Sequence, residues 1–116
     1  MELETMHSAV DGPIATVTLN RPHVLNSANE QWARDLNTLV DDLAANDRIR
    51  VVVVRGAGRA FCSGIDVTAL SHGETGLGFF RDWETALRKI ETLDPVVIAA
   101  TYTNFLAVSR ELARDG

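Results

Sequence analysis

A run of mostly β-branched, apolar residues from Ile49 to Val54 does most to restrict what this chain can fold into. Such a run is typical of a strand buried on both faces of a sheet. A long connection rich in glycine, 56–78, follows it, and then comes an amphipathic helix. A second apolar run, Val96 to Ala100, predicts another buried strand. The helix carries its apolar residues at helical spacing: Phe79, Trp83, Leu87, Ile90 and Leu93. The whole unit predicts a right-handed parallel crossover of strand, loop, helix and strand.

A hairpin is expected before this unit. The segments Leu3 to Ala9 and Ile14 to Leu19 have the pattern of strands, and Asp11-Gly12 between them is a strong turn signal. Pro13 then limits pairing where the second strand begins. The chain therefore opens with two antiparallel strands.

A helix is expected between the hairpin and the Ile49 strand. Ser27 followed three residues later by Glu30 fits a capping box, with Ser27 as the N-cap. The helix should end near Asn46 and carry one apolar face, made of Trp32, Leu36, Leu39, Val40 and Leu43. Residues 104–115 have the pattern of a terminal helix.

Composition restricts the partners that the chain can have. A length of 116 residues allows one small domain, and 46% hydrophobic residues argue for a globular protein. A net charge of -5 without a basic stripe argues against nucleic acid. The longest apolar run is too short to span a membrane and no signal segment opens the chain, which favours a cytosolic protein. The single cysteine, Cys62, excludes an intrachain disulfide, and the three histidines lack metal-site spacing.

The segment from Arg59 to Val67 is the best candidate for chemistry. Small residues form a turn there that leads into a short helix, and this leaves backbone N–H groups able to bind an oxyanion. Arg21, Arg55 and Arg59 fall in predicted loops near this glycine-rich segment. They are either a local cationic site for phosphates or three solvated arginines.

Other kinds of chemistry fit the residues less well. Ser63 lacks the GxSxG pattern of a hydrolase nucleophile, because phenylalanine occupies the position of the first glycine. Asp66 could be a catalytic acid, but capping of a short helix from Val67 to Leu70 is the favoured role. His23 is an acid/base, a phosphate contact or a solvated loop residue. Gly56-Ala57-Gly58 is only a fragment of a dinucleotide fingerprint.

Three segments resemble the crotonase (enoyl-CoA hydratase/isomerase) family, in the family's order and spacing. The first is Ile14-Ala15-Thr16-Val17-Thr18-Leu19-Asn20-Arg21-Pro22, followed by Leu25-Asn26. The second is Val51-Val52-Val53-Val54-Arg55-Gly56, followed by Arg59-Ala60-Phe61-Cys62-Ser63-Gly64-Ile65-Asp66-Val67. The third is Asp94-Pro95-Val96-Val97-Ile98-Ala99-Ala100. The resemblance covers residues 1–100.

This resemblance implies an α/β fold of the ClpP/crotonase type, a spiral of ββα turns of which the chain holds the N-terminal portion. Residues 1–100 would form the half that binds acyl-coenzyme A, and residues 101–116 a diverged terminal helix. The backbone N–H of Ile65 would be one oxyanion-hole donor for the thioester carbonyl. The implied binding residues are Arg21, His23, Val24, Ser63, Gly64, Ile65 and Asp66. No permanent cofactor is implied, because coenzyme A is part of the substrate.

The sequence departs from the family pattern after Ala100. The family's glycine-rich turn, which supplies the second oxyanion donor, is replaced by Ala107-Val108-Ser109. Glu111 falls at the position of one hydratase acid/base, and it is either that group or a solvated charge. The family's second acidic position would lie beyond the last residue.

Three interpretations of function stay open on the sequence alone. The chain could be a hydratase or isomerase, for which hydration of a 2-enoyl-CoA is the expected ancestral reaction. It could instead be a non-catalytic acyl-CoA binder or accessory subunit, as a homo-oligomer or with full-length family members. An unpaired strand at Val96 to Ala100 would invite such a partner chain. The third interpretation is an inactive gene fragment.

Overall fold

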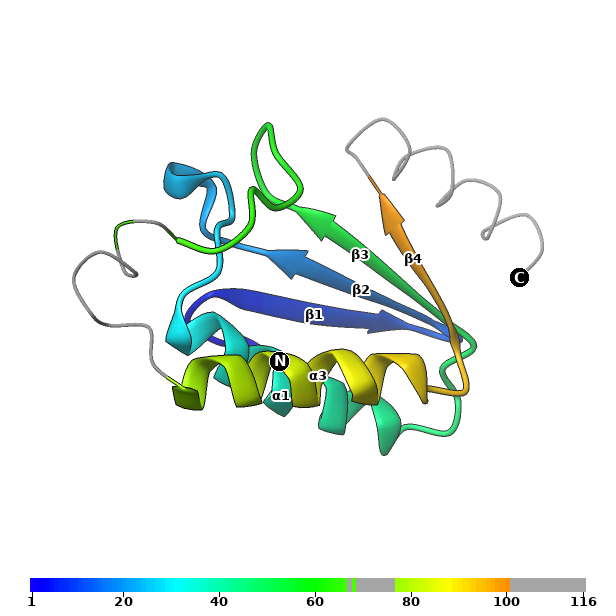
Figure 1. Ribbon diagram of the computed structural model, residues 1–116. Helices are drawn as coiled ribbons and strands as arrows, with labels where there is room; N and C mark the ends of the chain where they lie inside the picture. Colours follow the sequence, from blue (N-terminus) through cyan, green and yellow to red (C-terminus); the bar gives the residue numbers. More distant parts are fainter. Residues whose placement is uncertain (67, 69–76, 101–116) are drawn as a thin grey trace.

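The described part of the chain forms a four-stranded sheet with helices along one side (Figure 1). The computed structural model describes residues 1–66, 68 and 77–100. The elements follow in the order β1 (Met6–Asp11), β2 (Ile14–Leu19), η1 (Pro22–Val24), α1 (Glu30–Ala44), β3 (Val51–Gly56), α3 (Leu77–Glu91) and β4 (Val96–Ala100). The strand order in the sheet is β1-β2-β3-β4. The predicted terminal helix lies outside the described residues, and so does the proposed division at residue 100.

The first two strands form the predicted antiparallel hairpin. Met6 pairs with Leu19 and Asp11 with Ile14, so that Gly12 and Pro13 make the turn. Gly12 has a φ of +58°, a conformation that glycine adopts without steric cost. The second strand has the predicted bounds, whereas the first begins at Met6 rather than Leu3 and continues to Asp11.

Parallel pairing of β3 with β2 and of β4 with β3 confirms the predicted parallel crossover. Strand β3 begins at Val51, two residues after the start of its apolar run. The N–H groups of Arg50 and Val51 both donate to the carbonyl of Pro13 there. The strand also ends two residues after the run, at Gly56. Arg55 therefore lies in β3, and its prediction as a loop residue was wrong.

The first helix begins later than the predicted capping box. Asn29 is the N-cap, and its Oδ1 accepts a hydrogen bond from the N–H of Trp32 at 2.9 Å. Ser27 is buried two residues earlier, where its carbonyl accepts a hydrogen bond from Arg21. Asparagine and serine are about equally good N-caps, and here asparagine takes the role.

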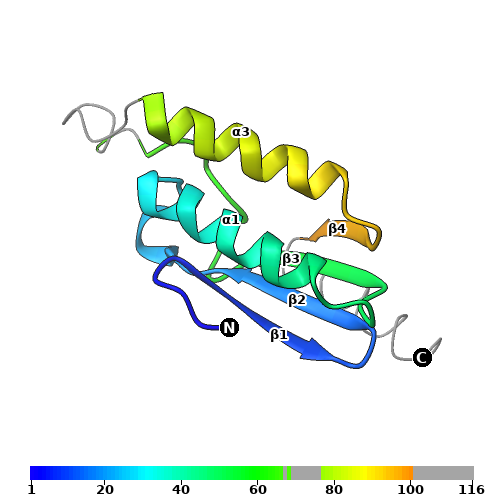
Figure 2. The same cartoon turned by 90° about the horizontal axis from the view of Figure 1, so that it is seen from below.

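The two helices lie along the same side of the sheet and pack against each other (Figure 2). Their central contact is between Trp32 of α1 and Trp83 of α3, whose rings stack with centroids 5.1 Å apart and an interplanar angle of 22°. Phe79 is fully buried beside this pair. The apolar stripe predicted for α3 therefore joins it to α1, although Leu87 is 43% exposed.

The core lies between α1 and one face of the sheet. Ala15, Val17 and Leu19 of β2 and Val52 of β3 pack with the buried face of α1. The segment before β1 is fixed to the same helix, because Oδ2 of the buried Asp35 accepts hydrogen bonds from the N–H and hydroxyl of Thr5 at 2.9 and 2.7 Å.

The last described strand is less buried than its sequence indicates. Among the described strands β4 pairs only with β3, at the edge of the sheet. Its first residue, Val96, is 62% exposed, and Ala99 is also exposed. The prediction that the Val96 to Ala100 run is a buried strand was therefore wrong for these two side chains.

Candidate functional site

Two loops meet at the carboxyl ends of the parallel strands (Figure 1). The first, 20–29, connects β2 to α1, and the second, 57–66, follows β3. They pair as two short parallel segments. The N–H of Ala28 donates to the carbonyl of Gly64 at 2.8 Å, and the N–H of Asp66 donates to the carbonyl of Ala28 at 2.9 Å. Ligands of open parallel sheets commonly bind at this edge of the sheet.

Asn26 joins the two loops from a fully buried position. Its Oδ1 accepts a hydrogen bond from the N–H of Arg21 at 2.7 Å. Its Nδ2 donates to the carbonyls of Ala57 and Ala60 at 2.9 and 2.8 Å. Asn26 has a φ of +56°, which asparagine tolerates better than most residues. One amide side chain thus sets the shape of both loops.

An ion pair joins the loops at a second place. Arg21 Nη2 lies 3.1 Å from Asp66 Oδ2, and both side chains are only 13% exposed. The same guanidinium donates to the carbonyl of Ser27. Oδ1 of Asp66 accepts the N–H of Thr68 at 3.0 Å, which fits the capping role predicted for Asp66.

We expect this pair to couple the loops energetically. In a double-mutant cycle with Arg21→Met and Asp66→Asn, the coupling energy should be about 1 to 2 kcal/mol, because the pair is mostly shielded from water. Urea unfolding of the four proteins measures it. The matched control is the exposed helical pair Arg34–Glu30, which should couple by only about 0.3 to 0.5 kcal/mol. Equal coupling in the two cycles would contradict the prediction.

The pairing of the loops also orients the backbone of Ile65. Both backbone hydrogen bonds of Ala28 go to the neighbours of Ile65, as in a parallel ladder, so the N–H of Ile65 points away from Ala28. Within the described part of the chain, no hydrogen-bond acceptor is found for this N–H. Ile65 is 37% exposed. This geometry leaves one backbone donor directed away from the first loop.

The other predicted site residues lie around this point. His23 in η1 and Ser63 in the second loop are exposed, and Val24 is half-buried. Gly64 has a φ of +105° and free space where a side chain would project. Glu111 lies outside the described residues. The guanidinium of Arg21 is paired with Asp66, whereas Arg59 is exposed.

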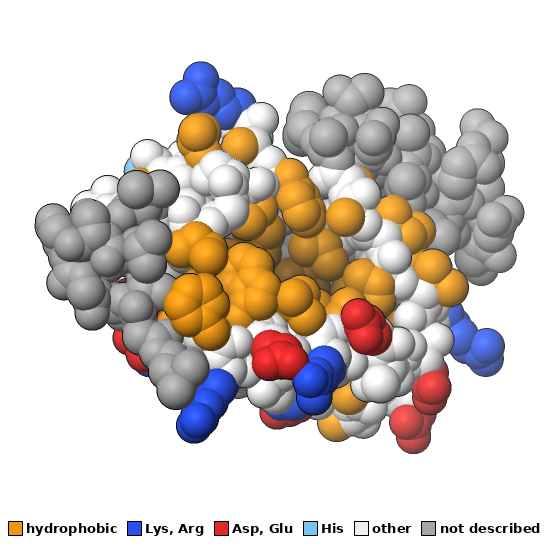
Figure 3. All heavy atoms as spheres, viewed as in Figure 1, with side chains coloured by type: hydrophobic (Ala, Val, Ile, Leu, Met, Phe, Trp, Pro, Cys, Tyr) orange, Lys and Arg blue, Asp and Glu red, His pale blue; other side chains and the backbone are white. Residues whose placement is uncertain are grey.

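An apolar hollow lies beside the second loop, with a volume of about 300 Å³. Figure 3 shows hydrophobic side chains gathered around it on one face of the molecule. Strand residues such as Val54 and Val97 line it, with Trp32 of α1 and Trp83 and Leu87 of α3. Phe61 lines it from the loop. The hollow exists because α3 packs mainly on α1 and leaves part of the sheet uncovered.

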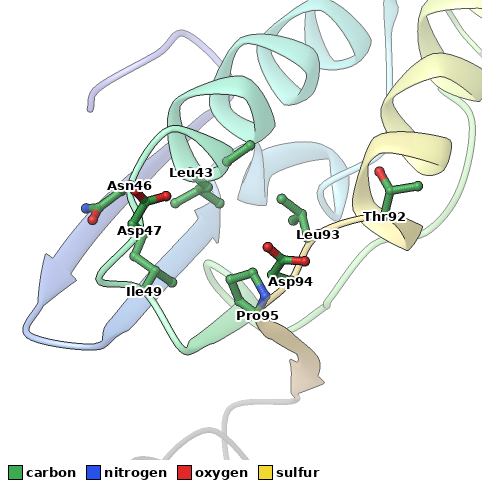
Figure 4. A pocket seen from close by; sticks show the side chains of 9 residues that line it. Leu43, Asn46, Asp47, Ile49, Thr92, Leu93, Asp94 and Pro95 are labelled. Atoms are coloured by element: carbon green, nitrogen blue, oxygen red, sulfur yellow. The ribbon is translucent and has the colours of Figure 1, made fainter.

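A second pocket lies at the opposite end of the parallel strands (Figure 4). It has a volume of about 160 Å³ and is lined by residues that precede β3 and β4, including Asp47, Asp94 and Pro95. Two carboxylates would repel an anionic ligand. This pocket is therefore a poor candidate for a site that binds phosphates.

Sequence reasoning missed two features of the site. Asn26 was noted only as part of a family-like segment, and an asparagine between a strand and a helix gives no signal that its side chain is buried and makes three hydrogen bonds. The hollow was also missed, because its lining comes from five helices and strands and from the second loop. The described residues contain no group of side chains suited to a metal ion. Their helices are too short or too polar to cross a membrane.

Comparison with known proteins assigns these features to a family. The family model described as enoyl-CoA hydratase/isomerase matches residues 14–101. A short-chain-enoyl-CoA hydratase of Clostridium acetobutylicum is 29% identical over 103 residues, which is 86% of this chain and 40% of that protein. A 1,2-epoxyphenylacetyl-CoA isomerase of Escherichia coli is 32% identical over 104 residues, or 84% of this chain and 40% of that protein.

Solved structures agree with the sequence comparison. An enoyl-CoA hydratase/isomerase from Marinobacter aquaeolei superposes with a TM-score of 0.72 at 28% identity, covering 84% of this chain and 40% of that one. The chain thus spans about two-fifths of the length of these relatives. The fold is the predicted crotonase-like α/β arrangement. The chain belongs to the enoyl-CoA hydratase/isomerase family, of which it holds an N-terminal portion.

Proposed function

We propose that this chain binds acyl-CoA thioesters at the two loops and polarises the thioester carbonyl, with hydration of a 2-enoyl-CoA as the reaction. The observation that carries this proposal is the N–H of Ile65, which points away from Ala28 and has no acceptor among the described residues. An N–H held in place by its neighbours needs no rearrangement to stabilise an oxyanion, and such a donor typically contributes about 3 kcal/mol to the transition state.

The exposed parts of the loops are the proposed contacts for coenzyme A. His23 and Val24 lie on the first loop and Ser63 on the second, and the pairing of the loops brings these segments together. Arg21 supports them indirectly, because its ion pair with Asp66 fixes the residue next to Ile65. The acyl group would extend from Ile65 toward the apolar hollow, whose loop side is formed by Phe61 and Cys62.

One observation favours a non-catalytic binder as the second candidate. The one acidic residue of the two described loops is Asp66, and its carboxylate already accepts hydrogen bonds from Arg21 and Thr68. Hydration needs a group that transfers protons, and the proposed acid/base Glu111 lies outside the described residues. A protein with this site alone would bind and polarise a thioester without turning it over, as an accessory subunit would.

Two ligands and two variants test the proposal. Crotonyl-CoA and free coenzyme A are titrated into the ¹⁵N-labelled chain, and shifts should concentrate in the two loops. Crotonyl-CoA should bind more tightly, because only it has a thioester carbonyl for the N–H of Ile65. Ile65→Pro removes that N–H and should reduce the affinity for crotonyl-CoA to that for coenzyme A. Ile65→Val keeps the N–H and should bind like the unmodified chain.

The outcomes separate the two candidates. Loss of the enoyl absorbance of bound crotonyl-CoA would support the hydratase, and binding without that loss would support the non-catalytic binder. Both candidate functions are wrong if the amide NMR spectrum is that of a folded protein and neither ligand changes it. The role of Ile65 is wrong if the proline and valine variants bind crotonyl-CoA equally well.

A further inference from the structure

The apolar hollow has an unusually aromatic lining for this chain. Aromatic residues make up 6% of the sequence, yet Trp32, Trp83 and Phe61 are three of the eleven residues that line the hollow. The other eight are aliphatic side chains and Cys62, and none of the eleven is charged. A ligand group that enters the hollow must therefore be uncharged and apolar.

Its size suits a ring better than a short chain. The hollow has a volume of about 300 Å³ and is partly open to solvent, and a closed apolar cavity of about 150 Å³ is already large enough to bind benzene. A short acyl chain would leave much of the space to water. A ring would fill more of it and would lose little internal freedom, because it has few bonds to immobilise.

The aromatic side chains that line the hollow explain why it would prefer an aromatic ring. Trp32 is 6% exposed and is held by its stack on Trp83, whose own ring is half-buried at the hollow. Phe61 is 36% exposed at the loop side. Aromatic rings attract each other in offset and edge-to-face arrangements beyond the effect of buried area, and this attraction is absent for a saturated ring.

We propose that the apolar hollow selects acyl thioesters that end in an aromatic ring, with Trp83 as the residue that determines this specificity. The inference rests on the proposed function, because the thioester must first be held at Ile65. Phe61 and Cys62 directly precede Ser63–Ile65 along the chain. The second loop therefore forms one wall of the hollow and also carries Ile65.

The chain provides its own optical probe for the test. Its two tryptophans, Trp32 and Trp83, both line the hollow, so tryptophan fluorescence reports on occupation of this space. The ligands are phenylacetyl-CoA, cyclohexylacetyl-CoA, butyryl-CoA and free coenzyme A. Phenylacetyl-CoA should change the emission most and bind roughly threefold to tenfold more tightly than cyclohexylacetyl-CoA, which has a ring of similar size without aromatic electrons.

Variants at Trp83 test whether this residue causes the preference for phenylacetyl-CoA over cyclohexylacetyl-CoA. Trp83→Leu should remove most of the difference between the two ring ligands and leave the affinity for free coenzyme A, which has no acyl group to enter the hollow, within about twofold. Trp83→Phe keeps an aromatic wall and should restore part of the difference. In the leucine variant Trp32 still reports binding, and amide NMR spectra show whether each variant is folded.

Three results would overturn the inference. Equal binding of phenylacetyl-CoA and cyclohexylacetyl-CoA by the unmodified chain would do so without any variant. A preference that persists in Trp83→Leu would reject Trp83 as its determinant. If all four ligands fail to bind, the proposed function falls as well. Binding of butyryl-CoA and coenzyme A with no preference for rings would leave the proposed function intact and reject only the aromatic selectivity.

Discussion

Asn26→Ala should lower the free energy of unfolding by about 4 kcal/mol, because it removes three hydrogen bonds made by a fully buried side chain. The substitution leaves the carbonyls of Ala57 and Ala60 and the N–H of Arg21 without their partner. Each unpaired buried group costs about 1 to 3 kcal/mol. Alanine also tolerates the φ of +56° less well than asparagine. Urea unfolding of both proteins measures the difference.

Two further variants identify the cause of this loss. Asn20→Ala changes an exposed asparagine at the start of the same loop and should alter stability by less than about 0.5 kcal/mol. Asn26→Asp keeps the shape but directs a carboxylate oxygen at two carbonyl oxygens, so it should destabilise at least as much as alanine. A loss below about 1 kcal/mol for Asn26→Ala would show that the hydrogen bonds of Asn26 are replaceable.

The second large effect is expected for Gly56→Ala, at about 3 kcal/mol of lost stability. A Cβ at Gly56 would lie 2.6 Å from the carbonyl oxygen of Phe61 and 2.8 Å from Asn26 Nδ2, with the carbonyl of Ala60 closer still. Two of these neighbours are backbone atoms, so the second loop would have to move away from β3. The midpoint and slope of urea unfolding measure the effect.

Gly78→Ala is the matched control. Gly78 is exposed in α3, and a Cβ there would lie 4.0 Å from Glu30 Oε1, outside any close contact. Alanine is the better helix former, so this variant should be as stable as the unmodified chain or more stable by up to about 1 kcal/mol. Similar losses in both variants would mean that the crowding at Gly56 does not limit stability.

Helices and strands were predictable wherever the hydrophobic pattern of the sequence agrees with the burial of the residues in the structure. Apolar residues and turn signals located β2 and β4 to the residue and the two helices to within three residues at either end. The start of β3 was predicted two residues early, because Ile49 is buried in the core without belonging to the strand. A hydrophobic pattern indicates which residues are buried, but it does not show whether a buried residue pairs within a strand.

Features that depend on contacts distant in the sequence were not predictable. The choice of Asn29 over Ser27 as N-cap follows from where the carbonyl of Ser27 binds Arg21. The lower burial of β4 depends on what lies beside the strand, which no local pattern contains. At the site, the resemblance pointed to Ile65, but only the pairing with Ala28 gives its N–H a direction.

The backbone character of the candidate donor has a consequence for how this protein tolerates mutation. Because the pairing of Ala28 with the neighbours of Ile65 sets the direction of the N–H, the side chain at Ile65 is not part of the donor. Random substitution should therefore be accepted at the proposed reaction point, apart from proline, and rejected at Gly56 and Asn26. A mutational scan read for ligand binding would find its most sensitive positions in the supporting loops, and would misplace the site if sensitivity alone were taken as its marker.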